Sequence, residues 1–189
     1  MTWDLPLSVF IDGEEYEIES QCDWRVILDI LVLYEDPNIE LFAKHSLAMV
    51  MFYKEPKKLK NPQAAVYEMV RIVDGKKPEE VKETGRTEDP LRLMSWSKDF
   101  HLIAPAVSSV LGYDIRTPGK YTHWWTFLGA WMSLKESTWQ CFVEIRKKRL
   151  KGENLEKWEE RVYRENKNEI DLPAVLTEEE EDYLFGEGG

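Results

Sequence analysis

The sequence predicts a mainly α-helical protein, a multi-helix bundle with a short N-terminal β-hairpin. Apolar residues recur at three- and four-residue steps over most of the chain, as on the buried face of a helix. Proline or glycine ends several of these runs, and one Asp-Gly pair near the N-terminus separates two short runs of strand-forming residues. The chain has 189 residues, 43% of them hydrophobic and 32% charged, so one packed core with a solvated surface is expected.

The hairpin is predicted over residues 8–19. Asp12-Gly13 sits between its two runs, and this pair readily adopts the positive φ angles that a tight hairpin turn needs. Tyr16 and Ile18 alternate with glutamates, so one face of the ribbon should meet solvent. Because an isolated hairpin is marginally stable in water, it must pack on the helices that follow.

Three helices are predicted in the first half of the chain. The first opens at Asp23 and ends before Asp36-Pro37, the second runs from near Pro37 to Pro56, and the third from Pro62 to Asp74-Gly75. Each carries an apolar stripe at helical spacing, which predicts one buried face per helix.

A polar segment over residues 75–89 is predicted to be an exposed linker. Asp89-Pro90 should then open a fourth helix that ends at Gly112, with Pro105 kinking or dividing it. The longest helix is predicted over 121–151; it is apolar nearly all round, which indicates a central position in the bundle.

A last helix is predicted over 154–169 and completes a single helical domain over residues 1–172. The remaining residues, 173–189, are strongly acidic and glycine-rich at the end, so we expect a flexible tail.

The charge argues against two classes of partner. A net charge of -11 at pH 7 would repel phosphate backbones and anionic lipid headgroups, so neither nucleic acid nor a membrane is expected as a partner. The basic stretch over residues 146–151 is interpreted as the solvated last turns of a helix. We expect no secretory signal and no membrane span, and two cysteines without metal or redox spacing fit a reducing cytoplasm.

The sequence offers no reaction centre. Its three histidines, His45, His101 and His123, lie far apart with no second ligand at helical spacing, and there is no HExxH, GxSxG or phosphate-loop motif. We therefore predict no catalytic, cofactor-binding or metal-binding residues, and a protein that is not an enzyme.

Eight tryptophans are the unusual feature of the composition. Tryptophan is enriched both in cores and at binding hot spots. For Trp96, Trp124, Trp131 and Trp139 the favoured interpretation is that they fill the interior, whereas Trp3 and Trp158 sit among polar neighbours and are better candidates for an exposed patch. The predicted partner-binding set is Trp3, Trp124, Trp125, Trp131 and Trp158.

The run from Tyr121 to Leu134, with His123-Trp124-Trp125 at its start, closely resembles the signature of a family of small siphophage proteins. These proteins are encoded near the tape measure gene and are regarded as tail assembly chaperones. Four further features follow in the family's order, so the resemblance extends from the hairpin to Pro173. They are residues 11–16, Asp23-Trp24-Arg25, residues 97–100 followed by 112–115, and the charged helix ending in residues 170–173.

The resemblance implies a protein made in the host cytoplasm that binds the aggregation-prone tape measure protein and is absent from the finished virion. The tail tube protein is a possible second partner, and several copies could line the client as a homo-oligomer. The family supplies no catalytic residues. In related systems a longer form arises by ribosomal frameshifting.

Three other functions remain open at this stage. An acidic protein can inhibit a nucleic-acid-binding enzyme by mimicking DNA, although lysines and arginines interrupt the acids along most of these helices. A hydrolase using glutamates and a metal would hold divalent ions between carboxylates. A minor tail component would be present in purified virions.

Overall fold

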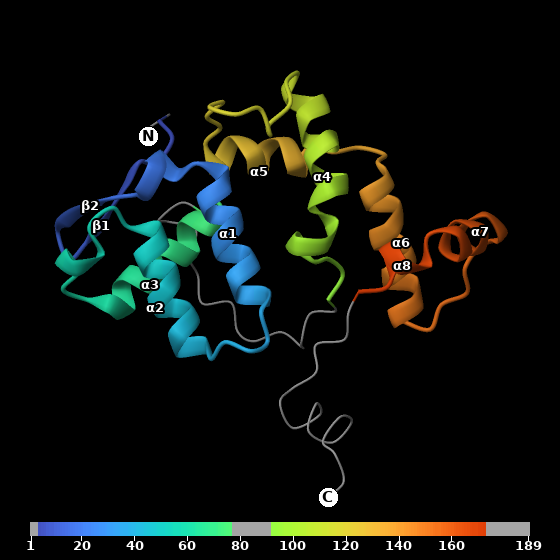
Figure 1. Cartoon of the computed structure of the whole chain (residues 1–189), viewed down its shortest axis with the longest axis horizontal. Coiled ribbons are helices and arrows are strands. Elements are labelled where there is room, and N and C mark those ends of the chain that lie inside the picture. Colours follow the sequence, from blue (N-terminus) through green and yellow to red (C-terminus); the bar gives the residue numbers. More distant parts are fainter. Residues whose placement is uncertain (1–3, 77–91, 173–189) are drawn as a thin grey trace, which may run out of the picture.

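The computed structural model describes residues 4–76 and 92–172, and in these ranges the protein is mainly helical with one two-stranded antiparallel sheet (Figure 1). The fold class predicted from the sequence is confirmed. The elements are β1 (Ser8–Ile11), β2 (Glu14–Glu17), the 3-10 helix η1 (Glu19–Cys22), α1 (Trp24–Glu35), α2 (Leu41–Phe52), the 3-10 helix η2 (Pro56–Lys58), α3 (Pro62–Val73), α4 (Trp96–Leu111), α5 (Trp124–Met132), α6 (Thr138–Leu150), α7 (Lys157–Glu165) and α8 (Lys167–Ile170).

The hairpin forms at the predicted place. Asp12 and Gly13 have φ of 50° and 83° and connect strands in which Val9 pairs with Tyr16. Val9, Ile11 and Tyr16 are buried while the glutamates beside Tyr16 are exposed. β1 packs on α3, so the apolar face of the ribbon completes the core.

The helices form two groups that meet at α4. α1, α2 and α3 pack side by side next to the hairpin, and α4 and α5 cover α1, whereas α6, α7 and α8 lie on the far side of α4 (Figure 1). The main core spans the hairpin and α1 to α5; a second, smaller cluster is centred on Phe142, Ile145 and Ile170.

α3 ends where the sequence predicts. Gly75 has φ of 69°, its N–H donates to the Ile72 carbonyl, and the Lys76 N–H donates to the Arg71 carbonyl. This is a Schellman ending, which needs a residue that tolerates positive φ. The rest of the predicted linker, residues 77–89, lies outside the described residues, as does the tail 173–189.

The predicted long helix over 121–151 is wrong, because this segment forms two helices, α5 and α6. α5 stops at Met132, and the side chain of Ser137 accepts the Gln140 N–H to start α6. A serine that bonds the backbone locally competes with helix continuation and favours a new N-terminus. α5 packs on α1 and α4, while α6 packs on α4 and α8.

Three smaller predictions from the sequence also differ from the structure. α4 begins at Trp96, not at Asp89-Pro90: Ser95 caps it, and the carboxylate of Glu35 accepts the N–H groups of its first residues. Pro105 does not divide α4, which continues to Gly112 as predicted. The last predicted helix starts only at Lys157 and is interrupted at Asn166, so it forms α7 and α8.

Candidate partner-binding surface

His123, which opens the His-Trp-Trp run, is the N-terminal cap of α5. Its Nδ1 accepts the Trp125 N–H at 3.0 Å, so the proton sits on Nε2, which donates to the Pro6 carbonyl at 3.0 Å. The side chain is buried, and this desolvation lowers the pKa of His123 below its ordinary value. A neutral imidazole thus begins α5 and ties it to the N-terminal segment.

Trp124 and Trp125 close the end of α3. The Trp124 Nε1–H donates to the Val73 carbonyl at 2.8 Å, and the Trp125 Nε1–H donates to the Ile72 carbonyl at 2.9 Å. The last carbonyls of a helix have no partner within it, so the Trp124 indole satisfies the Val73 carbonyl, while the Trp125 indole is a second donor to the Ile72 carbonyl beside the Gly75 N–H. Trp124 is 1% exposed and Trp125 is half-buried, so the His-Trp-Trp segment holds the fold together.

A row of aromatic rings connects the main core to α6. Trp96 lies 5.2 Å from Trp131 between ring centroids, and Trp131 lies 5.5 Å from Trp139. The row runs through Trp24, Phe127, Trp124, Trp96, Trp131 and Trp139. The interior role favoured for Trp96, Trp124, Trp131 and Trp139 is confirmed for Trp124, which is buried in the main core, whereas the other three are partly buried and pack against that core.

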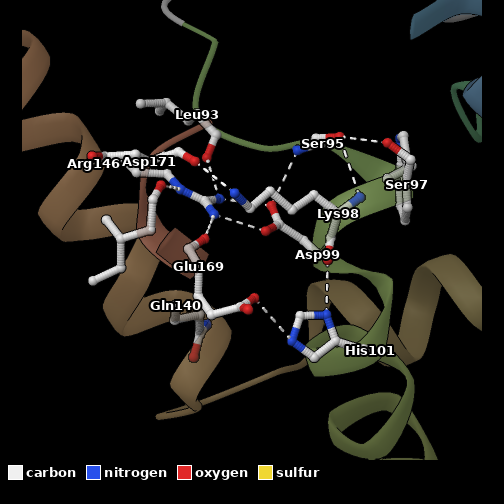
Figure 2. Close-up of polar contacts among 12 residues, drawn as sticks. Leu93, Ser95, Ser97, Lys98, Asp99, His101, Gln140, Arg146, Glu169 and Asp171 are labelled. Atoms are coloured by element: carbon white, nitrogen blue, oxygen red, sulfur yellow. Dashed lines mark hydrogen bonds and ion pairs between the residues drawn. The ribbon is translucent and has the colours of Figure 1, made fainter. Parts of the chain in front are cut away.

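Arg146 joins α6 to α4 and α8 through a buried ion pair (Figure 2). Its guanidinium lies 2.6 and 2.8 Å from the two carboxylate oxygens of Asp99. The remaining N–H groups donate to the carbonyls of Leu93, Glu169 and Ile170. The expectation of a wholly solvated basic stretch is therefore wrong for Arg146, whose side chain is 4% exposed.

α7 is held on α6 by a second internal pair. Lys148 Nζ lies 2.6 Å from the carboxylate of Glu159, which also accepts the Glu156 N–H. Desolvation opposes the charged form of this buried carboxylate, but the hydrogen bonds from Lys148 and the Glu156 N–H outweigh it and lower the pKa of Glu159. The pair thus connects α7 to α6.

Between α6 and α7 lies an open groove of about 770 Å³, which we call the α6–α7 groove. Its apolar side chains are Trp139 and Val143, one turn apart on α6, and Trp158 on α7, which is 49% exposed. The other lining residues are Lys135, Glu136, Ser137, Gln140, Cys141, Glu144, Lys148, Glu156 and Glu159.

A second apolar surface is the outward face of α2, which we define by Phe42, Leu47 and Val50. These side chains are 81%, 47% and 62% exposed, while Ala48 and Phe52 on the opposite side are buried. α2 is thus apolar on both sides, although only one side reaches the core. Clusters of exposed apolar side chains mark interaction sites in soluble proteins.

In the part of the chain that the structure describes, the charged side chains beside the hairpin form ion pairs with one another. A depression between the hairpin and η2 is lined by lysines and glutamates, but Lys54 pairs with Glu17, Lys58 with Glu55 and Lys60 with Glu14. Across residues 4–76 and 92–172 no group of three or more His, Cys, Asp or Glu side chains could hold a metal ion. His45 contacts Tyr34, and His101 lies 3.4 Å from Glu169.

The predicted partner-binding tryptophans have different positions in the fold. Trp3 lies outside the described residues. Trp124, Trp125 and Trp131 pack in or against the main core, so their rings offer little surface to a partner in this conformation. Only Trp158 combines substantial exposure with a groove, as its polar neighbours in the sequence had suggested.

Sequence reasoning missed several surface residues. The i, i+4 pair Trp139 and Val143 could be read from the sequence, but it appeared to belong to one long central helix. Phe42, Leu47 and Val50 resembled a core stripe, because the pattern of α2 does not reveal which apolar side faces solvent.

None of the helices in the part of the chain that the structure describes has the length and apolar run that a bilayer-spanning segment requires.

Comparison with known proteins relates the chain to phage proteins. Residues 1–172 match the model of a family described as Bacteriophage Gp15 protein. No curated protein and no solved structure matches the chain. The matched range reaches to the end of the α6–α8 group, so it includes both apolar surfaces.

Proposed function

Because the chain belongs to the Bacteriophage Gp15 protein family, we propose that it is a tail assembly chaperone. In this role it binds the tape measure protein during tail morphogenesis and catalyses no reaction. The proposal rests on the phage family together with the resemblance of the Tyr121–Leu134 segment to the tail chaperone signature.

The observation that carries the proposal is the exposure of large apolar side chains on well-formed helices. Phe42, Val50 and Trp158 keep 81%, 62% and 49% of their surface accessible in the folded chain. An apolar helix face on a client could cover such side chains, and burial stabilises a complex by roughly 25 cal/mol per Å² of apolar surface.

The net charge of the chain is consistent with a chaperone that keeps its client soluble. A net charge of -11 keeps a complex with an aggregation-prone client soluble through mutual repulsion. Several copies of the chain would line one long client, with the tail tube protein as a second partner. The protein would act in the host cytoplasm and leave before the virion is complete.

Co-expression with the tape measure protein of the same phage tests the proposal. We expect the two proteins to co-purify and the tape measure protein to stay soluble only when this chain is present. Gel filtration of the purified complex then gives the number of chaperone copies per client.

Mass spectrometry of purified virions tests whether the protein leaves before the virion is complete. The chain should be missing from finished particles and present in lysates of infected cells. A tape measure protein that is equally soluble alone and never co-purifies would overturn the chaperone role, and a fixed copy number in virions would indicate a structural tail component.

A further inference from the structure

Resting on the proposed function, we infer that the α6–α7 groove binds a basic amphipathic helix of the client. The occupant is an α-helical segment of the tape measure protein with an apolar stripe flanked by lysine or arginine. Three features of the groove lead to this chemistry: its shape, its apolar side chains and the charges on its rim.

The groove has the form that a helix fills. It lies between two helices and is lined by Trp139 and Val143, one turn apart along α6, and by Trp158 of α7. Such a row accepts apolar side chains spaced three and four residues apart on a third helix. An exposed tryptophan beside a groove is a typical binding hot spot.

The rim of the groove is acidic. Of its six charged residues, Lys148 and Glu159 neutralise each other at 2.6 Å. The other charged lining residues are Lys135 and three glutamates, Glu136, Glu144 and Glu156, of which Glu156 accepts the Trp158 Nε1–H at 2.8 Å. Glu144 has a weak contact with Lys147 at 3.9 Å and is 59% exposed, so it remains available to a cation from a partner.

Charge also selects among possible occupants. The acidic run over residues 178–182 has the same sign of charge as the rim, so charge does not favour it as the occupant. A second copy of a chain with net charge of -11 meets the same repulsion. A client segment carrying lysine or arginine is attracted, which accelerates its association and selects against acidic segments.

The α6–α7 pairing gives the groove a stable shape. The ion pair between Lys148 and the buried Glu159 connects α7 to α6, and Trp139 continues the aromatic row that begins in the main core. Both walls are therefore in place before a client arrives, which reduces the conformational entropy lost on binding.

Overlapping peptides from the tape measure protein of the same phage test the inference. Peptides of about 25 residues form roughly seven helical turns, enough to span the groove. Binding of labelled peptides to the full-length protein is measured by fluorescence anisotropy. We expect the peptides that bind to carry an apolar stripe with flanking lysine or arginine, and to bind more weakly as salt is added.

Two variants locate the site, each with a matched control. Trp158→Ala should weaken peptide binding about tenfold or more, whereas Phe10→Ala, which removes an aromatic ring that is 67% exposed on β1, should leave it unchanged. Glu144→Lys should weaken binding several-fold, whereas Asp29→Lys makes the same charge change at an exposed position of α1 outside the groove. Unfolding curves confirm that each variant folds.

Cys141 provides an independent measurement. This thiol lines the groove and is partly exposed, whereas Cys22, the other cysteine of the chain, is fully buried. A bound peptide should slow the alkylation of Cys141. Alkylation at the same rate with and without saturating peptide would contradict the groove assignment.

The outcomes separate the inference from the proposed function. If the wild-type protein co-purifies with the tape measure protein but Trp158→Ala and Glu144→Lys bind peptides as wild type does, the groove assignment is wrong while the chaperone role stands. A preference of the wild-type protein for acidic peptides would also contradict the groove assignment. If the wild-type protein neither binds a peptide nor co-purifies, the chaperone role itself fails.

Discussion

Arg146 and Asp99 form a bidentate ion pair between α6 and α4, with side chains 4% and 1% exposed. Three backbone carbonyls accept the other N–H groups of the guanidinium, so this buried cation has a full set of partners. The pair lies where the two groups of helices meet, and it orients the walls of the α6–α7 groove relative to the main core.

Removing one partner of this pair should lower the stability of the fold. Arg146→Ala leaves the Asp99 carboxylate buried without its counter-ion, and we expect the free energy of unfolding to fall by about 3–5 kcal/mol. Urea denaturation followed by circular dichroism measures the loss. Lys147→Ala, which removes the neighbouring, exposed cation of the same helix, should change stability by less than about 0.5 kcal/mol.

The pair has a second test in a double variant. Arg146→Met combined with Asp99→Leu removes both charges together, so it should be more stable than Arg146→Ala alone. A double variant that is less stable than Arg146→Ala would contradict this, and would indicate that the Asp99 carboxylate, which also accepts the Ser95 N–H, stabilises the fold even without Arg146.

His123 should make stability depend on pH. Burial lowers its pKa below the ordinary 6.5, so below that pH the unfolded chain binds more protons than the folded one. The stabilisation is complete above pH 6.5 and declines as the pH falls toward the lower pKa of the folded state. His123→Asn keeps a capping side chain without a titrating ring, so its free energy of unfolding should change less between pH 7.5 and pH 5. Parallel pH profiles for the two proteins would rule this out.

The two buried tryptophans of the main core should respond differently to removal of the indole N–H. Trp124 donates to the Val73 carbonyl, whereas the Nε1 of Trp24 is buried with no hydrogen-bond partner among the described residues. Trp124→Phe should therefore cost about 1–3 kcal/mol more than Trp24→Phe, because it leaves a helix-end carbonyl without its donor. Thermal and urea unfolding of both variants gives the comparison, and equal losses would contradict it.

The outward face of α2 should contribute little to folding. Phe42→Ser and Val50→Ser alter exposed side chains, so each should change the free energy of unfolding by less than about 0.5 kcal/mol while raising solubility. Phe52→Ser, on the buried side of the same helix, should cost about 3–5 kcal/mol. A large loss from Phe42→Ser would show that this face is covered in solution.

The sequence determined the elements whose signals are local. The Asp12-Gly13 turn, the strand alternation at Tyr16 and the glycine endings at Gly75 and Gly112 were predicted correctly, because positive φ angles and alternating burial depend on only a few neighbouring residues. The mainly helical class followed from apolar spacing in the same way.

Tertiary structure decided how these elements meet and which side chains remain exposed. The spacing of apolar residues was nearly continuous from Tyr121 to Lys151, yet the cap at Ser137 divides the segment and directs α6 away from α5. Arg146 appeared to be a surface cation, and only the approach of Asp99 from a distant helix makes it a buried one. Apolar residues on α2 and α7 are likewise core or surface depending on which neighbours cover them. Burial and ion pairing are long-range properties, since they depend on side chains distant in sequence that folding brings within a few ångströms.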